Sequence, residues 1–262
     1  MKIKKYIKIW LRYTAGTSQI AFESRTGAAI FIIGKILRFV FFLLFIVVIF
    51  SKTKTVAGYS LWQMIFFFLT FNLVDTLPQF LLRDVYRFRG QIINGYFDHT
   101  LLKPVSPLFK SLFGGSDIFD FFIMIFLIVM LIIGVEHLGG VSSLNIFLYI
   151  LLIINAFIIA LSFHIFVLCL GILTTEVDNA IMLYRDLTQM GRFPVDIYRE
   201  PLKSIITFVI PIGIMMTIPA KVMLGVFNIQ IIIVSFGIGI LIFMLSVLLW
   251  RYSLTKYSSA SS

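Results

Sequence analysis

Charged side chains are scarce in this sequence: 13% of its 262 residues are Asp, Glu, Lys or Arg, whereas 60% are hydrophobic. A soluble domain carries about 25% charged residues, and one aqueous core cannot hide so many apolar side chains. The mean hydropathy is +1.04, so lipid must solvate much of the chain. The composition excludes an ordinary soluble protein and predicts an all-α, polytopic membrane protein.

Cysteine is almost absent as well. Cys169 is the only one, and it lies within an apolar run. This excludes a disulfide framework and a cysteine-based metal site. We expect no metal and no resident cofactor in this chain.

Motifs for catalysis are missing too. The sequence contains no GxxxxGK[ST] phosphate-binding loop, so ATP hydrolysis by such a loop is excluded. It also lacks HExxH, GxSxG and paired-carboxylate motifs, and no Gly-rich filter or regular arginine repeat indicates an ion channel. We therefore expect that the chain is not an enzyme.

Six apolar stretches are long enough to cross a hydrocarbon core of about 30 Å, which requires about 20 helical residues. They cover residues 30–50, 60–82, 118–135, 144–173, 205–225 and 229–250. The fourth is long enough to tilt or to extend into the cytosol, and a re-entrant turn within it is the alternative. We treat residues 1–262 as a single transmembrane domain.

Residues 1–27 precede the first span and carry apolar side chains at helical spacing. These are Ile3, Tyr6, Ile7, Trp10 and Leu11, with basic residues between them. The pattern predicts an amphipathic helix in the membrane interface. It either sets depth and orientation only or contacts a partner.

Lysine and arginine are distributed unevenly among the loops. With a cytoplasmic N-terminus, only Lys52, Lys54 and Lys221 of the 22 basic residues fall outside. The positive-inside rule therefore predicts that both termini are cytoplasmic. Because the basic residues flank spans, as anionic lipid favours, we expect membrane lipid and no nucleic acid as a partner.

The longest polar stretch, residues 83–117, separates the second and third spans; we call it the island. Arg83, Arg87 and Arg89 come directly after the second span. There they are expected to anchor the chain at the anionic leaflet. The island is either an ordinary loop with an interfacial helix or a surface that binds a soluble partner.

Within the island, Gly90 and Gly95 loosen the chain. A short apolar stripe follows at helical spacing: Ile92, Ile93, Tyr96 and Phe97. It predicts a short helix parallel to the membrane. Pro104 and Pro107 end that helix, because proline lacks an N–H.

Two segments carry a resemblance to a known family. RGQIINGYFDHTLLKPVSPL lies in the island, and RFPVDIYREPLKSIITFVIPIGIMMTIPAKVMLG covers residues 192–225. Together with six spans, they resemble permease subunits of bacterial type-2 ATP-binding-cassette (ABC) exporters. The resemblance implies a permease in the bacterial cell membrane, paired with a second permease, identical or a sister subunit. Two cytosolic ATPase subunits would bind ATP and magnesium and dock on it.

The resemblance also implies where coupling to the ATPase would occur. The coupling helix would lie in the island, at Arg87, Gly90, Ile92, Ile93, Gly95, Tyr96, Phe97, Leu101 and Leu102. A second cytoplasmic turn, before the fifth span, would contribute Phe193, Pro194, Tyr198 and Pro201.

Some polar and kink-forming residues lie inside the predicted spans. Asp75, near Asn72 on the second span, either lines a substrate path or pairs with Lys35 or Arg38 on the first span. We favour the ion pair. Four residues of the fifth span are candidates for the path: Pro211, Met215, Met216 and Pro219. Alternatively, the prolines only shape the packing, and the methionines are lipid-facing filler. Prolines can kink a span, and methionines adapt to varied ligands.

Asn155 and His164, on the fourth span, are nine residues apart and point to opposite faces of a straight helix. Interhelical hydrogen bonding is the expected role of each. In the rival hypothesis of an ion-coupled secondary transporter, Asp75 and His164 would titrate. A third hypothesis is a membrane scaffold that uses the island for binding only. The substrate is not determined by these residues.

Overall fold

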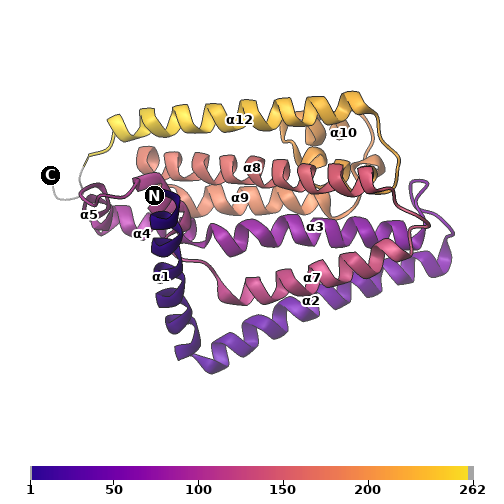
Figure 1. Ribbon diagram of the computed structural model, residues 1–262, viewed down its shortest axis with the longest axis horizontal. Helices are drawn as coiled ribbons and strands as arrows, with labels where there is room; N and C mark the ends of the chain where they lie inside the picture. Colours follow the sequence, from indigo (N-terminus) through magenta and orange to yellow (C-terminus); the bar gives the residue numbers. More distant parts are fainter. Residues whose placement is uncertain (1, 259–262) are drawn as a thin grey trace.

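The computed structural model describes residues 2–258 and is 82% helical, with no strand in that part of the chain. Five helices are long and apolar enough to cross a membrane, and they form an elongated bundle (Figure 1). These are α2 (Arg25–Lys52), α3 (Leu61–Leu81), α7 (Ile118–Glu136), α8 (Ser143–Thr174) and α12 (Ile229–Thr255). They correspond to five of the six predicted spans.

Polar side chains mark the starts of these helices. Ser60 and Gln63 form a reciprocal capping box before α3. Ser142 accepts a hydrogen bond from the third residue of α8, and Asn228 caps α12 in the same way. Caps of this kind satisfy backbone N–H groups that have no partner within the helix.

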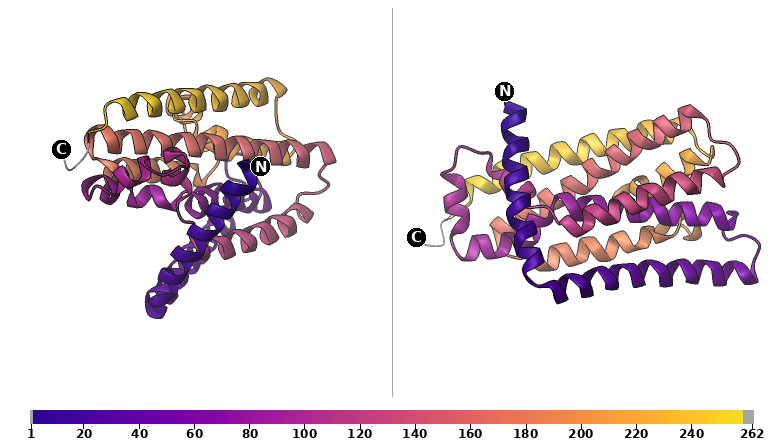
Figure 2. Two further views of the ribbon diagram at one scale, coloured as in Figure 1. Left: turned by 60° about the vertical axis from the view of Figure 1, so that its left-hand side comes forward. Right: turned by 60° about the horizontal axis from the view of Figure 1, so that its bottom comes forward.

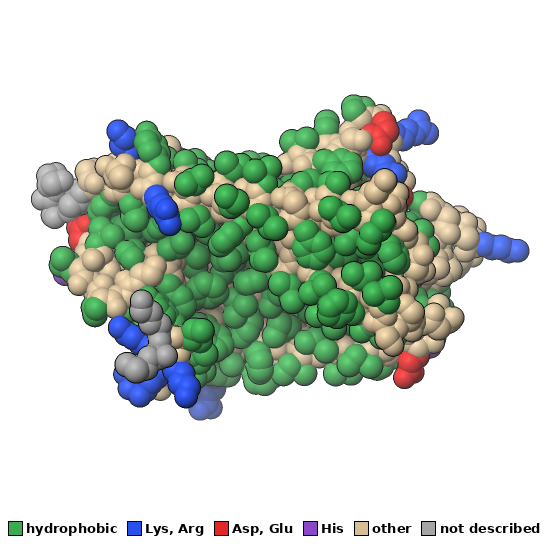
Figure 3. Space-filling view, turned by 45° about the horizontal axis from the view of Figure 1, so that its top comes forward, with side chains coloured by type: hydrophobic (Ala, Val, Ile, Leu, Met, Phe, Trp, Pro, Cys, Tyr) green, Lys and Arg blue, Asp and Glu red, His purple; other side chains and the backbone are tan. Residues whose placement is uncertain are grey.

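Charge and hydrophobicity separate along the bundle. Figure 3 shows one face whose middle is covered by hydrophobic side chains, while charged side chains gather toward the two ends. We call the end that carries residues 83–117 the island end and the opposite end, where the loop 53–60 joins α2 to α3, the far end.

Helix α1 (Lys2–Glu23) lies across the bundle at the island end (Figures 1 and 2). The island itself folds into four short helices. They are η1 (Arg83–Arg87), α4 (Phe88–Ile93), α5 (Tyr96–Leu101) and α6 (Pro107–Phe113). The predicted stop at Pro104 and Pro107 is confirmed, with the difference that Pro107 also begins α6.

The fourth predicted span is one continuous helix, α8, so the alternative of a re-entrant turn within it is wrong. After α8 the chain turns back at the island end and forms α9 (Val177–Gln189). In Figure 1, α9 runs between α8 and α3. Tyr184 of α9 packs against His164 of α8, with ring centroids 5.0 Å apart.

Helix α9 reaches only the middle of the bundle. The short helix η2 (Met190–Arg192) follows it, and the Arg192 guanidinium lies 5.1 Å from the centroid of the Phe42 ring, near the middle of α2. From there the chain continues through η3 (Val195–Ile197) to the far end. Tyr59, next to the start of α3, donates a 2.9 Å hydrogen bond to Asp196.

The predicted second cytoplasmic turn is therefore misplaced. Phe193, Pro194, Tyr198 and Pro201 do not share an end of the bundle with the island. The polar residues of α9 predict an aqueous loop in this part of the sequence. Helix α9 carries exposed polar residues, yet its buried face packs inside the bundle.

The fifth predicted span is not a single crossing helix. Residues Leu202–Val209 and Gly213–Met223 form two helical legs bent by 76°. They comprise α10 (Leu202–Ser204), η4 (Ile205–Val209), η5 (Gly213–Thr217) and α11 (Ile218–Met223). The bend falls at Pro211, which lacks an N–H and drives the preceding residue out of the helical region.

The two outer ends of this bent pair lie close together, next to Asp196 at the far end. Lys203 at the start of the first leg and Lys221 near the end of the second both contact Asp196, at 2.9 and 2.6 Å. The pair is therefore a re-entrant loop at the far end. Helix α9 and the irregular segment that follows it run from the island end to the far end, with Val177, Ile181 and Val195 buried in the bundle.

Candidate functional site

The island is held against the bundle by an aromatic cluster. Phe97 of α5 is fully buried and packs edge-on against Phe88 of α4, with centroids 5.2 Å apart, and against Tyr257 at 5.1 Å. Its ring also meets that of Trp250 on α12, at 6.4 Å. The two short helices are thereby fixed to the island end of α12.

Tyr257 adds a polar tie at the same place. Its hydroxyl donates a 2.7 Å hydrogen bond to Asp98 of α5. Burial and this hydrogen bond raise the pKa of Tyr257 to about 12, so the phenol remains a donor at neutral pH.

Asp84 is the centre of the island's charged contacts. Its carboxylate is buried and receives Lys110 of α6 at 2.7 Å, Gln91 of α4 at 3.2 Å and Arg87 at 3.6 Å. A buried carboxylate stabilises a fold only when its partners remain. This one connects η1, α4 and α6 into one unit.

The three arginines expected to anchor in lipid all have carboxylate partners within the protein. Arg83 lies 3.6 Å from Asp117, and Arg89 lies 3.2 Å from Asp178 at the start of α9. The third, Arg87, belongs to the Asp84 group. Their contacts therefore connect the island to itself and to α9.

Exposure divides the predicted coupling residues into two sets. Ile93, Tyr96 and Leu102 are 52%, 63% and 83% exposed, respectively. Ile92 and Phe97, their neighbours in sequence, are buried. Leu101 is 39% exposed, and Arg87 also lies partly at the surface. We call Ile93, Tyr96 and Leu102 the exposed patch.

The two island glycines differ in what they permit. Gly95 has φ of +71° and makes the turn between α4 and α5, a conformation that other residues rarely adopt. Gly90 lies within α4, and a Cβ there would meet its nearest neighbour at 3.9 Å. Only Gly95 is required by the backbone.

Helix α1 packs on the island with one side of its apolar stripe. The Trp10 indole donates a 2.8 Å hydrogen bond to the Ser116 hydroxyl, and the rings of Tyr6 and Phe109 lie 4.7 Å apart. Ile3, Ile7 and Leu11 form the other side and are more than half exposed. The amphipathic helix is confirmed, and part of it also supports the island.

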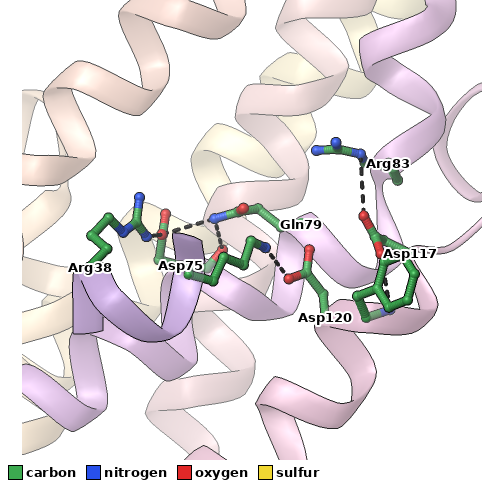
Figure 4. A network of polar contacts seen from close by, with 8 residues as sticks. Arg38, Asp75, Gln79, Arg83, Asp117 and Asp120 are labelled. Carbon is green, nitrogen blue, oxygen red and sulfur yellow. Dashed lines mark hydrogen bonds and ion pairs between the residues drawn. The ribbon is translucent and has the colours of Figure 1, made fainter. Parts of the chain in front are cut away.

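A cluster of charges joins α2, α3 and α7 within the bundle. Arg38 of α2 contacts Asp75 of α3 at 3.7 Å, so the favoured ion pair is confirmed. Lys35, one turn away, forms a hydrogen-bonded ion pair with Asp120 of α7 instead. Gln79 donates to Asp75 at 2.9 Å. Figure 4 shows Arg38, Asp75, Gln79 and Asp120 close together; we call these four residues and Lys35 the α2 cluster.

Asp120 had not been singled out from the sequence. It lies in the first turn of α7, where a carboxylate near the end of a span is unremarkable, and it is 85 residues from Lys35. Its side chain is nevertheless completely buried. A rule that flags any carboxylate within an apolar helix would have found it.

A second cluster lies at the far end. Asp196 accepts from Tyr59, Lys203 and Lys221 at 2.6 to 2.9 Å. Burial alone would raise the pKa of Asp196, but the hydrogen bonds from both lysines outweigh it and hold the pKa below its ordinary value. This far-end cluster fastens the loop 53–60, η3 and both legs of the re-entrant loop together.

The residues proposed for a path through the fifth span are core residues in this structure. Pro211, Met215, Met216 and Pro219 are all buried. Asn72 is partly exposed and donates to the Phe68 carbonyl of its own helix at 2.7 Å. This arrangement favours the packing alternative for the prolines, and it contradicts the interpretation of Met215 and Met216 as lipid-facing filler.

The two polar residues of α8 behave differently. Asn155 donates a 2.9 Å hydrogen bond to the Ser235 carbonyl of α12, as predicted. His164 makes its hydrogen bond to the Ala160 carbonyl of its own helix, at 2.8 Å, so the predicted interhelical bond is wrong. Its ring packs against Tyr184 instead. No group of three potential metal ligands occurs among residues 2–258.

Comparison with known proteins identifies a family for this chain. No curated protein and no solved structure matches the chain significantly. The family described as ABC-2 family transporter protein matches residues 36–261, which is most of the sequence. The five helices that are long and apolar enough to cross a membrane agree with this match. The chain therefore belongs to the ABC-2 family of transporter proteins, as a multi-pass membrane subunit of an ABC transporter.

Proposed function

We propose that this chain is the permease subunit of an ATP-driven ABC exporter in a bacterial cell membrane. It forms the substrate path with a second permease, identical or a sister subunit, and couples to two separate cytosolic ATPase subunits. The sequence has no phosphate-binding loop of its own, so ATP and magnesium would be bound by those partners.

The exposed patch is the observation that carries this proposal. Ile93, Tyr96 and Leu102 project from a unit whose buried side is fixed by Phe97 and Asp84. Exposed apolar and aromatic side chains on a firmly held surface are typical of protein-binding sites. A rigid unit can also transmit a movement of the ATPase to the transmembrane helices, which a flexible loop cannot.

The contacts of the island suggest how such a push would spread. Phe97 packs on Trp250 of α12, and Arg89 contacts Asp178 of α9. Movement of the patch would therefore reach α12 and α9, besides α3 and α7, which flank the island. Since residues 193–201 lie away from the island end, α9 is proposed to take over the role first assigned to that turn.

Basic residues support a cytoplasmic island end. The far end carries five of the 22 Lys and Arg residues: Lys52, Lys54, Arg199, Lys203 and Lys221. Lys203 and Lys221 share the Asp196 carboxylate. The remaining excess at the island end follows the positive-inside rule, so both termini are proposed to be cytoplasmic.

Helix α9 is proposed to face the second permease and a water-accessible path between the two. Its outward face carries Asp178, Met182, Arg185 and Asp186, all exposed in the isolated chain. Ionisable side chains at this depth are expected to face protein or water rather than lipid. A second permease chain would supply such surroundings.

Co-purification with the ATPase tests the proposal. A variant with Ile93→Ser, Tyr96→Ala and Leu102→Ser removes the exposed patch without changing a buried residue. We expect loss of ATPase binding or, if binding survives, ATP hydrolysis that no longer drives flux in proteoliposomes.

Val226→Ser is the matched control, because Val226 is an exposed apolar residue between the re-entrant loop and α12 and is 56% exposed. It should bind and transport as the natural chain does. Normal binding and normal coupled flux in the triple variant would contradict the proposal. Flux without any ATPase would instead indicate an ion-coupled transporter, and binding of the natural chain without flux would indicate a scaffold.

A further inference from the structure

A groove opens between α2, α3 and α7 beside the α2 cluster. It encloses about 400 Å³, within the size range of small-molecule sites. Its walls are mainly apolar and include Phe39, Val40, Phe126 and Leu127. Its polar lining residues are Lys35, Arg38, Asn72, Thr76 and Gln79.

The charged side chains in and next to this groove are exposed to different degrees. Arg38 and Lys35 side chains are 45% and 21% exposed, whereas those of Asp75 and Asp120 are 9% and 0% exposed. The groove therefore presents its cations to a ligand and keeps its carboxylates behind them. The Arg38–Asp75 contact is 3.7 Å long, and a guanidinium has five N–H donors.

The position of the groove points to a lipid. Lys35 lies in the half of α2 nearer the island and Arg38 at the middle of this helix, and the apolar wall extends to both sides of them, from Ile32 to Val40. A phospholipid has both parts that this lining can bind, an anionic head group for the two cations and acyl chains for the apolar wall. Much of α2 is exposed, so the groove can be reached sideways.

We propose that this groove binds one glycerophospholipid, whose phosphate accepts hydrogen bonds from Arg38 and Lys35 and whose acyl chain lies against Phe39, Phe126 and Leu127. A phosphate matches the exposed guanidinium because charge-assisted hydrogen bonds to it are short and strong. The site is independent of the proposed function, since a bound phospholipid can be cargo or a permanent part of the subunit.

Native mass spectrometry of the purified chain tests this site. The chain is exchanged into an alkyl-maltoside detergent, titrated with phosphatidylglycerol, and the bound lipid is counted. Two variants probe the two parts of the site. Arg38→Gln removes the exposed cation, and Ile36→Trp fills the groove at a lining residue that is 53% exposed. Lys52→Gln, at the other end of α2, is the control.

We expect one retained phospholipid on the natural chain and on Lys52→Gln, and affinity about tenfold lower in Arg38→Gln, equivalent to one charge-assisted hydrogen bond. Ile36→Trp should retain none. Competition with millimolar inorganic phosphate should leave the lipid bound, because the acyl chain contributes most of the contact.

Three results would overturn the proposal. Equal retention by Ile36→Trp and the natural chain would show that the lipid binds elsewhere. Equal loss in Lys52→Gln would show only general attraction to basic residues. An altered oligomeric state of Ile36→Trp with unchanged lipid would identify the groove as a protein contact. ATPase binding by the exposed patch is measured separately, so failure here leaves the proposed function untouched.

Discussion

The α2 cluster and the far-end cluster both place ion pairs within or beside the bundle, yet they are built differently. Asp196 takes three partners at 2.6 to 2.9 Å, from three separate segments. In the α2 cluster each carboxylate has its own cation: Lys35 forms a hydrogen-bonded ion pair with Asp120, whereas the Arg38 contact with Asp75 is 3.7 Å long. The far-end cluster and the Lys35–Asp120 pair fasten the fold, whereas Arg38 keeps donors available to a ligand.

The largest effect is expected for Lys35→Met, which leaves the fully buried Asp120 carboxylate without its cation. Removing one partner of a buried pair costs about 3 kcal/mol, which lowers the apparent Tm in detergent by roughly 10 °C. Thermal unfolding of the purified chain measures this fall in Tm. The double variant Lys35→Met with Asp120→Leu should recover most of the loss. If the single and double variants unfold alike, the pair does not act as described.

The next effect is expected for Asp196→Asn. This substitution leaves Lys203 and Lys221 without their carboxylate and loosens the re-entrant loop. We expect the free energy of unfolding to fall by about 2 kcal/mol and the apparent Tm by roughly 5 °C. Asp178→Asn is the control, because its pair with Arg89 is more than half exposed and such pairs contribute at most about 1 kcal/mol. Equal shifts in the two variants would remove the distinction between a fastening cluster and a surface pair.

A smaller effect is expected for Arg38→Gln. Its contact with Asp75 is long and half exposed, and Gln79 still donates to the carboxylate. We expect a loss of about 1 kcal/mol or less, measured by the same unfolding assay. A loss as large as that of Lys35→Met would mean that Arg38 is a structural partner and would weaken the case for a ligand there.

The smallest effect concerns pH. The pKa of Asp196 is held below its ordinary value of 3.8, so folding favours the carboxylate. Its contribution to stability is present above that value and is lost as pH falls through the lowered pKa. The difference in Tm between the natural chain and Asp196→Asn should therefore be constant from about pH 8 to 5 and shrink only below about pH 4. A difference that already declines near pH 6 would contradict the pKa direction.

Sequence patterns predicted the ranges of the main helices well because each helix depends on residues that are close together in the sequence. The range 118–135 became Ile118–Glu136, and 144–173 became Ser143–Thr174. The route after α8 was not predictable in this way. Val177–Gln189 contains too many polar residues for a span, and only its buried face shows that it runs inside the bundle.

The candidate site was predicted in part. Helical spacing found the stripe from Ile92 to Phe97, but it could not tell that Ile93 and Tyr96 point outward while Ile92 and Phe97 point inward. The choice depends on Trp250 and Tyr257, which come from the other end of the chain. No local signal carries that information.

Hydropathy, caps and prolines were enough to establish a helical membrane protein and the ends of its main helices, since a helix satisfies its backbone hydrogen bonds within one segment. Folding alone decided which carboxylate each of Lys35 and Arg38 meets, and at which end of the bundle Asp196 lies. Those choices depend on side chains far apart in the chain that meet only when the helices pack. The family follows from the sequence, whereas the difference between a fastening cluster and a binding groove follows from this packing.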